Sequence, residues 1–339
     1  MDSKRPDKYR TVKQLVALLC IALLASCTWV KDDTDDCPND RPSDLKGFWL
    51  NLHYTYNILD VEAVQKYVKD ATVYVYDAAG NYVKRIDVPE ATLAANSHRV
   101  KVEGLTEGDY RFVVWSGIGN SEYAIADDQA GMDDFRLSLA GGQQESAVKL
   151  PDLYYGSLET VHYDDKYASH DVYLMKNTNQ LACLVVSISS DTKLEVEDYD
   201  MSIVTANGAM DVNNKLVADT ETTYMPFSQK AAVVDDSEYG TLNGIQFDIS
   251  TLRLMEDTDS RLIFQKKDSE TPVFNISFPQ FIGMVGSLYT NLGRPLTVQE
   301  YLDRQDFYTI VFFLSEDANT LLQLKVNSWR LRAYNHLKL

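Results

Sequence analysis

"ATVYVYDAAGNYVKRIDV", residues 71–88, decides the fold class because it encodes two short strands around one turn. Val, Tyr and Ile recur in both flanks, and such β-branched and aromatic residues favour the pleated, half-buried surface of a strand. Between the flanks, the residues from Asp77 to Asn81 have turn chemistry, and Gly80 tolerates a positive φ. The stretch therefore predicts a β-hairpin.

The segments on either side carry the same strand pattern. In "FWLNLHYTY", residues 48–56, the apolar side chains fall on one face at period two, which indicates a half-buried strand. "HRVKVEGLTEGDYRFVVWSG", residues 98–117, predicts a strand, a turn at Gly108 and Asp109, and a second strand from Tyr110 to Trp115. The first half is thus predicted to be all β.

The second half repeats this order in a diverged form. "LACLVVSIS" at residues 181–189 predicts a long strand, and "YDMSIVTANGAMDV" at 199–212 predicts another strand followed by an Asn207-Gly208 turn. We therefore hypothesise a duplication. Further strands are expected in "GIQFDISTLRL" (244–254), "RLIFQKKD" (261–268), "VFNISFPQ" (273–280), "FYTIVFFL" (307–314) and "LLQLKVNSW" (321–329).

One short helix is predicted near the end of the chain. Thr297 and Glu300 fit a capping box that opens "TVQEYLDRQ", residues 297–305.

Residues 156–170 are polar without a clear period, and the chain is longer than a single hydrophobic core usually supports. We place an N-terminal domain at residues 47–165 and a C-terminal domain at residues 166–339.

The first 26 residues are predicted to be an export signal. Five basic residues precede an apolar run from Leu15 to Ala25, which is shorter than the roughly 20 residues of a membrane span. The residues "LASC" that end at Cys27 resemble the lipobox of bacterial lipoproteins, whose cysteine carries diacylglycerol and becomes the first mature residue. The alternative is an ordinary secretory signal with Cys27 incidental.

Residues 27–46 are predicted to form an acidic tether. The segment contains six aspartates and two prolines, so it buries too little apolar surface to fold and repels itself into an extended chain. Acyl chains on Cys27 would hold the protein on a membrane without a spanning helix. Lys31, Asp32 and Asp33 are similar to the surface-export signal on lipoproteins of the Bacteroidetes, which favours the outward-facing leaflet.

The charge of the chain excludes nucleic acid as a partner. The leader holds five basic and two acidic residues, so its removal changes the formal net charge from −18 to −21. Binding to phosphates depends on Lys and Arg, and so acidic a surface repels them. With 21 Tyr and only 25 Gly and Pro residues in total, the composition fits a β-rich exported protein.

Two cysteines remain once Cys20 has left with the leader and Cys27 carries lipid. Cys37 and Cys183 can form a disulfide in an oxidising compartment. The alternative is that Cys183, in its apolar strand, is a small buried hydrophobe.

No catalytic constellation is found, so the chain is not expected to be an enzyme or to take a small-molecule substrate. There is no nucleophile elbow, phosphate-binding loop or dinucleotide fingerprint. His162 and His170 lie in a polar loop without the fixed spacing of a zinc site, and no metal is expected. The aromatic residues at period two are expected to fill the core rather than to form a carbohydrate platform.

These features together resemble the FimB/Mfa2 family of fimbrial anchor subunits. The resemblance rests on the lipobox, the Cys37-Pro38 tether, "LNLHYTYN" (50–57), "ATVYVYDAAGNYV" (71–83), "GDYRFVVWSG" (108–117), "LPDLYYGS" (150–157) and "LKVNSWRL" (324–331). It implies two tandem transthyretin-like β-sandwich domains with one or two short helices. It also implies a minor subunit, lipid-anchored at the base of the fimbrium on the cell outer membrane and exposed on the surface.

The resemblance further implies that the protein tethers the fimbrial shaft and terminates or limits its polymerisation. Its partners would be shaft subunits, joined by strand addition, and the outer membrane, reached through lipid. No cofactor is expected beyond the covalent diacylglycerol and N-acyl lipid (palmitate) on Cys27. The alternative function is a surface lipoprotein that binds glycans or host ligands as an adhesin.

Overall fold

The structure is a computed structural model that describes residues 47–332, apart from 143, 165, 219, 287, 290–292 and 328, and apart from the side chains of 329–332. The predicted signal peptide and tether lie outside the described residues. So do Cys27, Lys31, Asp32, Asp33 and Cys37.

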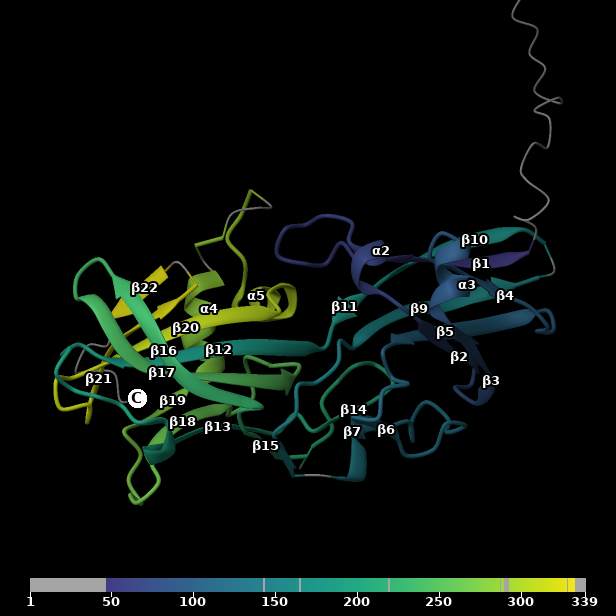
Figure 1. The fold of residues 1–339 in the computed structure, drawn as a ribbon. Helices are drawn as coiled ribbons and strands as arrows, with labels where there is room; N and C mark the ends of the chain where they lie inside the picture. Colours follow the sequence, from purple (N-terminus) through teal and green to yellow (C-terminus); the bar gives the residue numbers. More distant parts are fainter. Residues whose placement is uncertain are drawn as a thin grey trace, which may run out of the picture. The chain divides into compact units, whose positions relative to one another are not determined.

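The first half of the described chain is built from two sheets (Figure 1). One has the strand order β10-β1-β4 and the other the order β11-β9-β5-β2-β3. Two short helices, α2 and α3, lie between strands of these sheets in the sequence. The elements are β1 (Phe48–His53), α2 (Val64–Tyr67), β2 (Ala71–Asp77), β3 (Tyr82–Val88), α3 (Glu90–Ala95), β4 (Arg99–Val102), β5 (Gly108–Ser116), β9 (Tyr154–Tyr163), β10 (Ala168–Tyr173) and β11 (Met175–Lys176).

The second half also has two sheets, of order β16-β17-β12-β20-β21-β22 and β19-β18-β13-β15-β8. Helices α4 and α5 follow β19 in the chain. The elements are β8 (Glu145–Ser146), β12 (Thr178–Ser187), β13 (Tyr199–Thr205), β15 (Thr222–Tyr224), β16 (Ser228–Asp236), β17 (Gly240–Leu252), β18 (Arg261–Lys266), β19 (Phe274–Ser277), α4 (Phe278–Gly286), α5 (Val298–Arg304), β20 (Phe307–Leu314), β21 (Leu321–Val326) and β22 (Trp329–Arg332).

Short strands connect the two halves. A three-stranded sheet of order β14-β7-β6 pairs β14 (Ala209–Met210) with β7 (Leu137–Leu139) and β6 (Tyr123–Ile125). Two 3₁₀ turns, η3 (Ala140–Gly142) and η4 (Val196–Asp198), complete the elements. The described residues are therefore mostly β, as the sequence predicted, but they contain four short α-helices where one or two were expected.

Strand pairing in the first half recurs in the second. Strand β1 pairs antiparallel with β4 and parallel with β10, and β12 likewise pairs antiparallel with β17 and parallel with β20. In the facing sheets, β2 lies between β3 and β5, as β13 lies between β15 and β18. Strand β9 then flanks β5 as β19 flanks β18. This repeated pairing is what the duplication hypothesis predicts.

The interior is lined with aromatic side chains, as expected for aromatics at period two. Strand β2 shows why: Val73 and Val75 join one apolar cluster, with Phe48 and Leu50, while Tyr74 and Tyr76 join the other. Successive side chains of a strand point to opposite faces, so alternating Val and Tyr serve two cores at once. The largest fully buried side chains include Trp115, Tyr74, Tyr76, Tyr154 and Tyr224.

Several boundaries differ from the sequence prediction. Gly108 and Asp109 do not form a turn, because β5 already begins at Gly108, and β4 and β5 belong to different sheets. The last predicted strand ends at Val326, and the chain then turns back into β22. The predicted domain boundary at residue 165 stays a prediction, while β10 and β11 pair with β1 and β9 of the first half.

Candidate assembly surface

The longest edge strand in the described part of the chain is β16, nine residues at one side of the six-stranded sheet. All nine residues pair with β17, from Ser228 opposite Asp248 to Asp236 opposite Gly240. Its centre is apolar, and Val233 is 61% exposed. An edge of this kind presents unpaired backbone N–H and C=O groups to another strand.

Both faces of β16 are apolar at its centre. Val234 lies opposite Leu242 in the register, and both belong to a small cluster with Val186, Val311 and Phe313 on one face of the sheet. Ala231 lies opposite Ile245, which belongs to the large core on the other face. Side chains of one face alternate along a strand, so Val233 shares the face of Ala231.

The other long edges are more polar. Strand β3 has seven residues, and Arg85 in it pairs with Asp87 and Asp128. Strand β10 has six residues, and its Asp171 accepts a hydrogen bond from Asn51 at 2.8 Å. Polar and charged side chains are how natural sheets protect their edges, and β3 and β10 carry them along their length.

A buried ion-pair cluster ties β11 to the start of β20. The Lys176 ammonium lies 2.8 Å from an Asp152 oxygen and 2.7 Å from an Asp306 oxygen, and its side chain is only 8% exposed. Burial opposes the charge, but the Asp306 and Asp152 carboxylates outweigh it and raise the pKa of Lys176 above its ordinary value. The cluster joins residues 130 positions apart in the chain.

Helix α5 supplies a second polar cluster. Thr297 caps the helix by accepting the Glu300 N–H at 3.1 Å, so this half of the predicted capping box is confirmed. The Glu300 carboxylate binds Arg294 and Arg304. Arg304 also lies 3.2 Å from an Asp60 oxygen and stacks over the Tyr56 ring, so α5 contacts the segment after β1.

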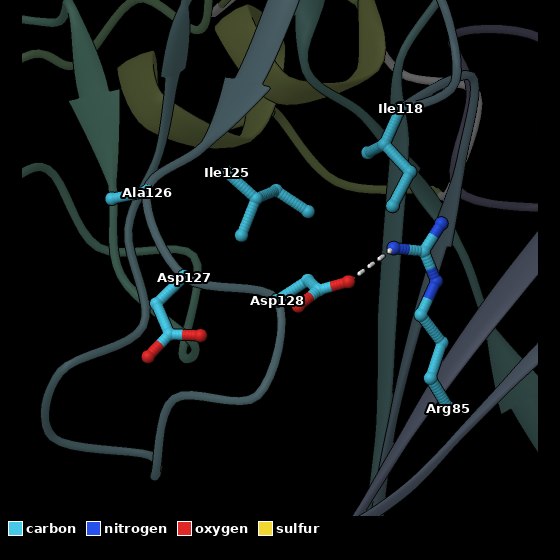
Figure 2. Close-up of a pocket in the computed structure, with 6 residues that line it drawn as sticks. All are labelled: Arg85, Ile118, Ile125, Ala126, Asp127 and Asp128. Atoms are coloured by element: carbon cyan, nitrogen blue, oxygen red, sulfur yellow. Dashed lines mark ion pairs between the residues drawn. The ribbon is translucent and has the colours of Figure 1, made fainter.

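Charged side chains contribute to the lining of two surface pockets. In the first, of about 420 Å³, Arg85 and Asp128 point toward each other and form an ion pair (Figure 2), with 3.5 Å between the two groups. The second, of about 740 Å³, is lined mainly by residues 213–218 and 253–259. Its Arg253 is already held by both oxygens of Asp303.

Cys183 is fully buried in the larger core as an unbridged thiol, and burial raises its pKa. A disulfide would require Cys37 to enter that core, and this pairing stays a prediction. His162 binds Asp109 at 2.9 Å, while His170 packs against Phe48, so the structure does not bring the two histidines to a common ligand.

The described residues contain no group of three or more His, Cys, Asp or Glu side chains arranged to hold a metal ion. They also contain no helix whose length and apolar character would suit a membrane span.

Sequence reasoning did not single out the β16 edge. The signal was present in "KAAVVDD", residues 230–236, where four consecutive apolar residues lie between charges. A short apolar run does not reveal whether its strand is central or at an edge, because that depends on pairing across the sheet.

Stacked sheets with an apolar open edge define a β-sheet protein suited to assembly with other chains. The family profile of fimbrillin-A associated anchor proteins Mfa1 and Mfa2 matches residues 34–335, and the chain belongs to this family. Membership assigns it a role associated with fimbriae. No curated protein matches the chain.

Solved structures share the fold. A Bacteroides thetaiotaomicron protein proposed to bind polysaccharide is 27% identical with a TM-score of 0.72, and the match covers 85% of this chain and 98% of that one. A proposed adhesin of the same organism is 26% identical with a TM-score of 0.73 and the same coverage, 85% and 98%. The fimbrial anchor protein Mfa2 from Porphyromonas gingivalis shares the fold, at 16% identity, a TM-score of 0.62 and coverage of 85% and 99%.

Proposed function

We propose that this protein is a lipid-anchored minor subunit that tethers the fimbrial shaft to the outer membrane and limits its polymerisation. The observation that carries the proposal is membership, over residues 34–335, of a family of fimbrial anchor proteins. In this proposal Cys27 bears diacylglycerol and an N-acyl chain, and Lys31, Asp32 and Asp33 direct the protein to the cell surface. The tether at residues 27–46 spans the distance between lipid and folded sheets.

The proposed attachment to the shaft is strand addition. An extended segment of a neighbouring subunit would pair with an open sheet edge, where main-chain hydrogen bonds provide affinity and alternate side chains provide specificity. The open edges of the sheets in both halves support this mechanism. An anchor that offers one such polymerising surface would end the fibre at the membrane.

Lipid attachment at Cys27 can be tested by substitution. Replacing Cys27 with Ala removes the acylated thiol, and stable membrane attachment needs acyl chains. We expect the variant and the fimbriae that it holds to appear in the culture medium, measured by immunoblotting of washed cells and supernatant. A variant that stays with the washed membranes would contradict lipid attachment at Cys27.

The matched control changes the neighbouring signal and keeps the lipid. Replacing Lys31, Asp32 and Asp33 with Ala should leave the protein in the membrane fraction but protect it from protease added to whole cells. Digestion at the wild-type rate would reject the surface-export role of these residues without affecting the role of Cys27.

A second candidate function is glycan binding as an adhesin. It is favoured by one observation, the 27% identity to a protein proposed to bind polysaccharide. The pocket of about 740 Å³ beside Arg253 offers amide and carboxylate side chains, including those of Asn213 and Asp257, which suit sugar hydroxyls. Binding of polysaccharide by the purified protein, lost on Asn213→Ala, would support this function. Absence of binding across a glycan panel would remove it.

A further inference from the structure

The two halves of the described chain are joined in sequence by a single residue. Strand β11 of the first half ends at Lys176 and β12 of the second half begins at Thr178, so only Asn177 lies between them. Halves that share so short a connection are expected to move relative to each other unless a large, apolar interface holds them. The contacts across this junction therefore decide whether the protein bends there.

Strand β8 crosses from the first half to the second. It lies between β7 and β9 in the chain but pairs with β15, in a sheet of the second half. The Thr223 N–H donates to the Gln144 carbonyl and the Met225 N–H donates to the Ser146 carbonyl, both at 2.7 Å. Backbone hydrogen bonds thus fix both ends of this strand to the second half.

Residues 209–214 cross in the opposite direction, and we call them the crossing strap. The strap begins as β14, which pairs with β7 from the first half of the chain. The Val212 carbonyl accepts a hydrogen bond from the Tyr155 hydroxyl at 3.2 Å, and the Asn213 side chain accepts one from Arg111 at 2.6 Å. The second half thereby reaches strands β5 and β9 of the first.

The end of the crossing strap closes on the connecting residue itself. The side-chain amides of Asn177 and Asn214 each donate to the other's oxygen, at 2.6 and 3.0 Å, and both side chains are buried. Arg253, which is held by Asp303 of helix α5, donates to the Asn214 carbonyl at 3.0 Å. Moving the strap away from the connection would leave two buried amides without partners, which costs free energy.

We propose that the crossing strap locks the two halves into one cooperative folding unit with no hinge at Asn177. Met210 and Val212 of the strap are buried in the same core as Trp115 of the first half and Phe247 of the second, so the interface is apolar and continuous. The described residues accordingly lie in one compact unit. The two predicted domains are then structural repeats that do not unfold separately. This inference does not depend on the proposed anchoring function.

Cys183 provides a probe of the second half. In a full mature chain that carries Cys27→Ala and Cys37→Ala, Cys183 is the one remaining thiol, and it is buried in β12. A short pulse of a thiol reagent at each urea concentration labels the molecules in which this core has opened.

Tryptophan fluorescence provides a probe of the first half. The chain has four tryptophans, and replacing Trp29 and Trp329 with Phe leaves Trp49 and Trp115, which are both buried in the first half. The two probes then follow the two halves in the same molecule. One cooperative unit should give the same urea midpoint for both probes.

A substitution confined to one half separates true cooperativity from midpoints that are equal by chance. Val73 is buried in an apolar cluster made only of first-half residues. Val73→Ala should lower the fluorescence midpoint by roughly 0.5–1 M urea, and in one cooperative unit it should lower the Cys183 labelling midpoint equally. A labelling midpoint that does not move would overturn the proposal.

The role of the crossing strap is tested by weakening it. Met210→Ser, Val212→Ser and Asn214→Gly together remove its apolar and amide contacts, and Gly tolerates the φ of +59° at residue 214. In this background, the shift that Val73→Ala causes in the labelling midpoint should fall to about half or less. Circular dichroism checks that the triple variant folds, and Asn214→Gly alone provides a milder form of the same test.

The matched control is Asn327→Gly. Asn327 also has a positive φ, of +53°, but its amide binds Thr309 and Tyr301 within the second half. The shift caused by Val73→Ala should be fully retained in this background. A shift that survives weakening of the strap, or one that is lost equally in the control, would overturn the assignment of the lock to residues 209–214.

Discussion

Lys176 shows how one residue holds distant parts of the chain together. It follows β9 and β10 in the first half, and its ammonium lies between Asp152 and Asp306, the latter just before β20. Asp152 also lies near the Tyr154 hydroxyl, at 3.2 Å, so the cluster is embedded among aromatic side chains. The charged Lys176 ammonium depends on these two carboxylates, because burial without them would strongly disfavour the charged form.

Replacing Lys176 with Ala should be strongly destabilising. The change leaves two partly buried carboxylates without their cation, and broken buried pairs cost roughly 3 kcal/mol. We expect a free energy of unfolding lower by about that amount, measured by urea denaturation. Lys166→Ala is the control, since Lys166 pairs with Asp164 on the surface and should leave the free energy of unfolding almost unchanged. Equal effects of the two substitutions would contradict a structural role for Lys176.

At the scale of the element, helix α5 combines a cap with a titratable ion pair. Hydrogen bonds from Arg294 lower the pKa of the Glu300 carboxyl below its ordinary value of 4.5, and Arg304 adds to the effect. A carboxyl whose pKa is lower in the folded state stabilises the fold above its unfolded pKa. That contribution is lost as the pH falls through the folded pKa.

Replacing Glu300 with Gln should therefore have a pH-dependent effect. We expect a loss of about 1 kcal/mol in unfolding free energy at pH 7, and this loss should shrink between pH 7 and pH 3 as the pH approaches the lowered folded pKa, because the wild-type carboxyl then begins to protonate too. Urea denaturation at the two pH values measures the difference. A loss of the same size at both values would mean that packing, not charge, is the contribution of Glu300.

The cap provides the control for this prediction. Thr297→Ala removes the hydroxyl that accepts the Glu300 N–H and should cost about 1 kcal/mol at pH 7 and pH 3 alike, because a hydroxyl does not titrate in this range.

At the scale of the whole molecule, the repeated strand pairing means that each half presents its own sheet edges.

Cells that lack this protein should carry longer fimbriae that detach easily, if the chain both anchors the shaft and limits its growth. Electron microscopy of cell-bound and shed fimbriae would measure length and attachment. Complementation with the Cys27→Ala variant should restore neither attachment nor surface retention. Fimbriae of wild-type length in the deletion strain would reject the length-limiting role.

The sequence by itself determined the class of fold. Alternation in "FWLNLHYTY" and the turn at Gly80 depend on neighbours within a few residues, so β1, β2 and β3 were predicted close to their observed bounds. Gly80 has a φ of +83°, as the turn required. The cap at Thr297 is local in the same way. The resemblance to the fimbrial anchor family, carried by motifs along the chain, is confirmed by the family profile.

Only the tertiary structure decided which strands became neighbours. The same short apolar pattern describes β12, at the centre of its sheet, and β16, at the edge, because periodicity reports burial but not pairing. Lys176 and Asp306 meet only after the chain has passed through β12 to β19, and no local signal marks such a contact. Long-range pairing across sheets therefore placed both the ion-pair cluster and the candidate assembly surface.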